Sequence, residues 1–177
     1  MSGARYSREA MLLHWGQAIL IVWLLWLGWM MTDLPKGAER GAAYGLHKSL
    51  GLLVLLLTLI RIGWRLRHPP PPSPLVGPMA RLAGATHGAL YGFLLLAPLA
   101  GYLASSFTPF AMKFFGVELP RLVAPDEALN AWFKQTHQWL VWGGAALVLL
   151  HLAGVLKHVW LRDGILGRML PGKLCKK

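Results

Sequence analysis

The stretch that decides the fold is THQWLVWGGAALVLLHLAGVLKH, residues 136–158. It is apolar over almost its whole length and is interrupted mainly by three histidines, His137, His151 and His158. An α-helix needs about 20 apolar residues to cross the ~30 Å hydrocarbon core of a bilayer. The stretch is therefore predicted to be a transmembrane helix. Ionisable side chains inside such a helix usually have a function.

Three further apolar blocks of similar length precede this stretch, at about residues 10–31, 44–64 and 87–112. The chain is 55% hydrophobic and only 14% charged, whereas a soluble domain carries about 25% charged residues. This composition excludes an ordinary soluble domain and a disordered chain. The single cysteine, Cys175, excludes a disulfide scaffold and is expected to be an unimportant tail thiol.

The four blocks predict an all-α integral membrane protein, a four-transmembrane-helix bundle that forms a single membrane domain over residues 1–177. The first block is too long for the ~7–15-residue core of a signal peptide, so it is expected to remain as a membrane helix. Asp126 is a predicted N-cap for the last helix. The expected helices are at about 8–31, 42–66, 82–112 and 126–161.

The net charge of +11 does not indicate nucleic acid, because the basic residues lie between the apolar blocks. Most of them fall in the N-terminus, the proline-rich connection after the second block, and the C-terminal tail. The positive-inside rule therefore predicts that both termini are cytoplasmic. The basic residues assigned to that side are Arg5, Arg8, Arg61, Arg65, Arg67, Arg81, Lys157, Arg162, Arg168, Lys173, Lys176 and Lys177.

Two histidines of the last helix are spaced so that both lie on the same face of that helix. His137 and His151 are fourteen residues apart, which is a difference of about 40° in direction and about 21 Å along the axis. Two ligands at that separation suit two cofactors, one near each membrane surface. Gly143 and Gly144 lie midway between them and are expected to leave room for flat macrocycles.

Depth along the helices supplies a partner for each of these histidines. His14 and His151 both lie near the cytoplasmic side, and His47 and His137 both lie near the outer side. The predicted pairs are therefore His14–His151 and His47–His137. Gly28 follows His14 by fourteen residues, so it is expected to face the outer pair.

Paired imidazoles on opposite faces of a flat site suit low-spin haem iron. Structural zinc sites usually have four N or S ligands, and each pair here offers two. No Cys-x-x-Cys-His sequence occurs, so the haems are expected to be non-covalent, b-type haems. The alternative is a set of structural or proton-relay histidines in a transporter or structural membrane protein with no cofactor.

Two other histidines, His87 and His158, are expected on the cytoplasmic side near the inner pair. Either one could replace an inner haem ligand. We expect them instead to line a pocket in which a neutral imidazole bonds a quinone carbonyl and delivers a proton.

The sequence resembles the bacterial cytochrome b561 family of the inner membrane. The resemblance covers nearly the whole chain. The matching motifs begin with Arg-Tyr-Ser-Arg and Leu-His14-Trp, and continue with Leu-His47-Lys-Ser-Leu-Gly51. After the basic, proline-containing linker come Ala-Thr-His87-Gly, Thr-His137-Gln and Lys-His158.

This resemblance implies a four-helix bundle with two b haems, iron as the metal, and electron exchange with ubiquinone. Small members of the family act as superoxide oxidases, which suggests superoxide as the outer donor. Lys48 and Lys134 lie beside the outer histidines and could attract that anion as catalytic residues. The expected partners are lipid, ubiquinone and superoxide. The rival interpretation is a cytochrome b subunit fed by a partner hydrogenase or dehydrogenase.

Overall fold

The computed structural model describes residues 5–170 as four long helices joined by short connections. All four helices are long and apolar enough to cross a membrane, which confirms the predicted membrane bundle. The tail cysteine, Cys175, lies outside the described residues. The helices are α1 (Arg8–Asp33), α2 (Ala38–Arg67), α3 (Gly77–Ser106) and α4 (Glu127–Leu161).

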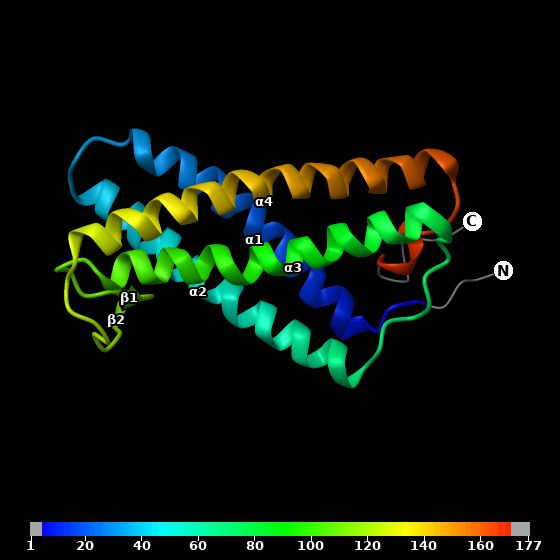
Figure 1. Cartoon of the computed structure of the whole chain (residues 1–177), viewed down its shortest axis with the longest axis horizontal. Helices are drawn as coiled ribbons and strands as arrows, with labels where there is room; N and C mark the ends of the chain where they lie inside the picture. Colours follow the sequence, from blue (N-terminus) through cyan, green and yellow to red (C-terminus); the bar gives the residue numbers. More distant parts are fainter. Residues whose placement is uncertain (1–4, 171–177) are drawn as a thin grey trace.

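Successive helices run in opposite directions, with α1 packed on α2, α2 on α3 and α3 on α4 (Figure 1). Both ends of the described chain and the α2–α3 connection lie at one end of the bundle, which we call the terminal end. The α1–α2 turn and a hairpin of β1 (Lys113–Phe114) and β2 (Val117–Glu118) lie at the hairpin end. The more basic segments thus share one end. That this end is cytoplasmic stays a prediction from the positive-inside rule.

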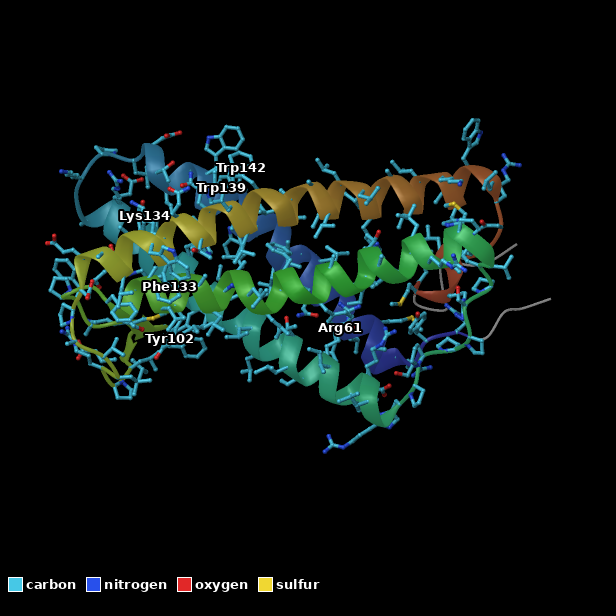
Figure 2. The ribbon with its side chains drawn as sticks, viewed as in Figure 1. Arg61, Tyr102, Phe133, Lys134, Trp139 and Trp142 are labelled. Atoms are coloured by element: carbon cyan, nitrogen blue, oxygen red, sulfur yellow. The ribbon has the colours of Figure 1, made fainter. Side chains whose placement is uncertain are left out.

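Large apolar side chains face outward, as expected for a protein surrounded by lipid. Trp139 and Trp142 on α4 are 69% and 60% exposed (Figure 2). The interior instead contains many small side chains, which let helix backbones approach closely. On α3 the buried alanines are Ala97, Ala100 and Ala104.

The ends of α4 are set by local chemistry. The Asp126 carboxylate accepts a hydrogen bond from the Leu129 N–H at 2.9 Å, which confirms the predicted N-cap. The helix ends at Leu161 because Arg162 adopts a left-handed conformation with φ 52°. The chain then turns back through Asp163 into the short 3₁₀ helix η1 (Leu166–Arg168).

The observed α3 begins and ends earlier than the predicted 82–112. It begins at Gly77, with Pro78 in the first turn, where the missing proline N–H costs nothing. It ends at Ser106, because Thr108 precedes Pro109 and the residue before a proline disfavours the helical region. The residues expected to complete this helix instead lead into the β1–β2 hairpin, which the sequence analysis did not predict.

The segment after α4 ties the terminal end together. The Tyr6 N–H donates to the Arg168 carbonyl at 3.2 Å, and the Trp15 indole donates to the Met169 carbonyl at 2.9 Å. The Arg168 guanidinium donates to the carbonyls of Pro71 and Pro72 at 3.2 and 2.8 Å. The start of the chain, the proline-rich connection and the end of α4 therefore converge at one place.

Candidate haem sites

The structure brings His47 of α2 and His137 of α4 together near the hairpin end. Their ring centroids are 6.2 Å apart and the ring planes are nearly perpendicular. His137 Nδ1 lies 2.7 Å from the Ala97 carbonyl. As the donor in that hydrogen bond, Nδ1 carries the proton and leaves the Nε2 lone pair available to a metal.

Two glycines make room for the rings of this pair. A Cβ atom at Gly28 of α1 would lie 3.0 Å from His47 Cε1, and one at Gly101 of α3 would lie 3.1 Å from His137 Nδ1. Gly28 therefore does face the pair of His47 and His137, as its spacing from His14 suggests. All four helices contribute to the site, since α1 and α3 supply the space that the two rings occupy.

A second pair lies toward the terminal end, where His14 of α1 meets His151 of α4. These ring centroids are also 6.2 Å apart, with an interplanar angle of 74°. The His87 ring of α3 lies 5.5 Å from the His151 ring, so this histidine does adjoin the pair. The fold thus brings the members of both predicted pairs together, and at the terminal end it also brings His87 beside His151.

Both separations fit two imidazoles bound to one metal ion. Two metal–imidazole bonds of about 2 Å each, with the distance from each nitrogen to its own ring centre added, give roughly 6 Å between centroids. His47 Nδ1 is buried and has no hydrogen-bond partner in the described structure. Within residues 5–170 no group of three or more His, Cys, Asp or Glu could hold a metal ion. The donor sets are thus imidazole pairs, which suit haem iron and do not suit structural zinc.

The space between the two pairs differs from expectation at one glycine. The Phe93 ring of α3 packs against Gly144, so closely that a Cβ there would lie 2.2 Å from Phe93 Cδ2. Gly143 has no heavy atom within 4 Å of its Cβ position. The expectation that both glycines leave room for macrocycles is therefore wrong for Gly144, whose space holds a phenylalanine ring.

The two lysines proposed for anion attraction both lie at the hairpin end. Lys48 follows His47 on α2 and is half-buried, whereas Lys134 on α4 is exposed (Figure 2). Lys134 lies one turn before His137. Lysines therefore adjoin both histidines of the hairpin-end pair along the chain.

His158 makes a contact that the sequence analysis missed. Its Nδ1 lies 2.5 Å from Asp163 Oδ2, across the turn that ends α4. Partial burial of Asp163 favours the neutral acid, but hydrogen bonds from the Ile165 N–H and from His158 favour the carboxylate and lower the pKa of Asp163. The carboxylate thus fixes the imidazole with Nε2 directed away from it. The left-handed turn at Arg162 creates this contact, and no spacing rule signals it.

A buried polar cluster beside His14 was also missed. Gln17 and Thr58 are 1% and 0% exposed, and the Gln17 amide donates to Thr58 Oγ1 at 2.8 Å. The Arg61 guanidinium donates to Gln17 Oε1 at 3.3 Å and to His14 Nδ1 at 3.1 Å; Figure 2 labels Arg61. The charge pattern assigns Arg61 to the basic segment after the second block. Its position inside the predicted helix 42–66 was the available signal.

Comparison with known proteins agrees with this geometry. A model of the family described as prokaryotic cytochrome b561 matches residues 5–172. "Cytochrome b561 homolog 2" of Escherichia coli K12 is 36% identical over 171 residues, which cover 94% of this chain and 91% of that protein. "Probable superoxide oxidase CybB" of Yersinia pestis is 29% identical, with 96% and 97% coverage. "Cytochrome b562" of Cereibacter sphaeroides is 33% identical, with 93% and 94% coverage.

Proposed function

The chain belongs to the prokaryotic cytochrome b561 family, and from that premise we propose that it is a di-haem cytochrome that carries electrons from superoxide to ubiquinone. It is a multi-pass protein of the bacterial inner membrane, and its family binds b-type haem in electron transport. The observation that carries the proposal is the presence of two histidine pairs, each 6.2 Å between ring centroids, in opposite halves of one bundle.

In this proposal His47 and His137 would hold the hairpin-end haem, and His14 and His151 would hold the terminal-end haem. When bound, each haem supplies an iron that accepts and gives up one electron. The chain would supply the imidazole nitrogens, exclude water with four apolar helices, and fix the separation of the two sites along α4. That separation is about 21 Å for residues fourteen apart on one helix.

Superoxide is proposed to react at the hairpin end. The relative named as a probable superoxide oxidase supports this choice of donor. As an anion, superoxide crosses hydrocarbon poorly, so it must react at an end that faces water. Lys48 and Lys134 provide positive charge on both helices that carry the hairpin-end pair, which raises the local concentration of an anion.

Ubiquinone is proposed to be reduced at the terminal end. His158 Nδ1–H is held by the Asp163 carboxylate, so only the imidazolium form, and not the neutral imidazole expected from the sequence, is placed to donate a hydrogen bond and a proton from Nε2 to a quinone carbonyl. His87 is exposed and adjoins His151, so it is a second candidate for the quinone pocket. Two superoxide anions are oxidised to two dioxygen molecules, and the two electrons with two protons convert ubiquinone to ubiquinol.

A pyridine haemochrome assay on the purified chain tests the first part of the proposal. We expect two b haems per chain, and a value near one or zero contradicts the assignment of four ligands. The second part is tested by adding superoxide to the oxidised protein alone, followed by ubiquinone. Haem reduction by superoxide and reoxidation by ubiquinone are expected. Reduction only after a partner hydrogenase or dehydrogenase is added supports the rival function as a partner-fed subunit.

A further inference from the structure

Arg61 is a charged residue in the terminal half of the membrane bundle, held by polar contacts to α1. Its two nitrogens donate to Gln17 Oε1 and His14 Nδ1 at 3.3 and 3.1 Å. Its guanidinium carbon lies 5.3 Å from the centre of the Tyr91 ring on α3. Charged side chains at this depth are costly unless they are paired, and they usually mark a site.

This positive charge has no carboxylate partner in the described chain. One turn later Arg65 also lies over Tyr91, with its guanidinium carbon 5.8 Å from the ring centre. Each ion pair among residues 5–170 joins two other residues, and none of them includes either arginine. Two guanidinium groups therefore share one aromatic ring without an anion, an arrangement suited to a bound anionic group.

The contact with His14 is incompatible with iron binding by the same histidine. A guanidinium has only donors, so His14 Nδ1 must accept the hydrogen bond from Arg61. In a neutral imidazole the proton then lies on Nε2, and that nitrogen has no lone pair for a metal. Ligation through Nε2 moves the proton to Nδ1, which then repels the N–H of Arg61. Arg61 must therefore leave His14 when this histidine binds iron.

We propose that Arg61 binds a carboxylate of the haem held by His14 and His151, and that it exchanges His14 Nδ1 for that carboxylate when the haem binds. This inference rests on the proposed function, which places a haem at this pair. Haem b carries two carboxylates, so it brings the anion that the arginine cluster lacks. Arginine is suited to this task because its planar fork binds a carboxylate through two parallel hydrogen bonds.

A phospholipid phosphate offers the same anionic chemistry, so the test must separate the two sources. The His137→Ala variant leaves the terminal-end pair as the one proposed haem site. The full chain of this variant, prepared in haem-deficient cells and purified in detergent, is titrated with haem b or with haem b dimethyl ester. The ester lacks the carboxylate charges and keeps the iron. Absorbance gives the affinity for each, and the ratio of the two affinities is the measured quantity.

The parent is expected to bind haem b about tenfold more tightly than the ester, the size of one charge-assisted hydrogen bond. Arg61→Gln is expected to bring the ratio close to one, and Arg61→Lys to leave an intermediate ratio. Arg67→Gln, an exposed arginine on the same helix, is the control and should keep the parental ratio. Because each ratio is taken within one variant, a general loss of folding cancels.

The midpoint potential provides a second readout. With haem b, Arg61→Gln leaves a carboxylate charge without its partner, which favours the oxidised iron. A tenfold change in the reduction equilibrium, or about 59 mV for one electron, is expected toward lower potential. With the ester the same substitution should produce a much smaller change.

Three outcomes overturn the inference in distinguishable ways. An unchanged affinity ratio in Arg61→Gln shows that Arg61 does not bind the haem carboxylate. A parental ratio near one, with thermal stability that rises with added phosphatidylglycerol in the parent but not in Arg61→Gln, assigns the site to lipid phosphate. Absence of any haem uptake by the His137→Ala variant contradicts the proposed function itself, because no haem then binds at the terminal-end pair.

Discussion

Individual histidines differ in what surrounds their second nitrogen. His137 donates to the Ala97 carbonyl and His47 Nδ1 has no partner in the described structure, whereas His14 must give up its contact with Arg61 when it binds iron. The hydrogen bond at the second nitrogen controls which tautomer is present and how basic the ligating nitrogen is. We therefore expect the two haem sites to have different potentials, even though their ring separations are equal.

Substitution of a single histidine should distinguish the two haem sites. His137→Ala should remove the hairpin-end haem and leave the other, and His151→Ala should do the reverse, since each substitution removes one of the imidazoles that would hold that haem. Haem content and low-temperature absorption spectra measure both outcomes. His68, an exposed histidine that stacks on Trp64, is the control, and His68→Ala should keep both haems. Loss of both haems from either ligand variant, with the fold retained, would show that the sites are not independent.

A second residue-scale prediction concerns the pair of His158 and Asp163. The pKa of Asp163 is lower in the folded chain than in a free carboxyl group. The stabilising contact between the Asp163 carboxylate and His158 is therefore fully present above the ordinary carboxyl pKa. It is lost only as the pH falls through the lowered pKa of the folded chain. Asp163 is thus ionised at neutral pH. Asp163→Asn should keep both haems and slow quinone reduction, though less than His158→Ala, for which a loss of roughly a hundredfold is expected of a general acid.

The reoxidation rate of reduced haem by ubiquinone, measured in stopped flow, gives the result for both variants. Asp126→Asn, a carboxylate at the other end of α4, is the control and should leave this rate unchanged. Loss of a haem in His158→Ala would instead show that His158, and not His151, is the inner ligand.

At the scale of elements, adjacent glycines of α4 have opposite surroundings. Gly144 receives the Phe93 ring, whereas Gly143 faces open space. Gly144→Ala must push α3 and α4 apart or displace Phe93, so it should destabilise the chain by about 1–3 kcal/mol. Gly143→Ala should be neutral or stabilising by up to about 1 kcal/mol, because alanine favours the helix. Thermal unfolding in detergent measures both, and equal effects would contradict the observed packing.

The elements were predictable where the rules are local. Length and composition define the four helices, the side chain of Asp126 sets the start of α4, and a fourteen-residue spacing aligns His137 with His151. The rest depends on contacts between distant parts of the chain. Arg61 meets His14 across 47 positions, and Phe93 fills Gly144 from another helix. The early end of α3 could have been predicted from the proline that follows it. The hairpin after α3 could not, because its strands have too few residues to show a periodic pattern.

For the whole molecule, the charge at the hairpin end predicts salt-dependent kinetics. Haem reduction by superoxide should slow as ionic strength rises, since the Debye length falls to about 8 Å at physiological strength. Lys48→Glu with Lys134→Glu should slow it further without loss of haem. Reduction by ubiquinol, which enters at the terminal end, is the internal control and should barely change. A rate of haem reduction by superoxide that changes neither with salt nor with charge reversal would contradict electrostatic attraction.

Orientation in the membrane is a second prediction for the whole molecule. The basic segments share the terminal end, so this end is predicted to be cytoplasmic. The single cysteine, Cys175, should resist a membrane-impermeant maleimide in intact spheroplasts and react in inverted vesicles. In a Cys175→Ser background, Val117→Cys on the exposed hairpin strand should show the opposite pattern. Labelling of Cys175 from outside would show that the terminal end is not cytoplasmic, and the proposed direction of electron flow across the membrane would then be reversed.

One feature of α4 also affects biogenesis. This helix contributes one histidine to each pair, and it is the last of the four to leave the ribosome. The first three helices can enter the bilayer in order, but neither histidine pair is complete until α4 is present. Both sites are completed in a single event, when α4 inserts beside α3. A ribosome stalled before residue 137 therefore leaves a membrane intermediate that has neither of the two pairs, and cofactor loading at both sites must wait for α4.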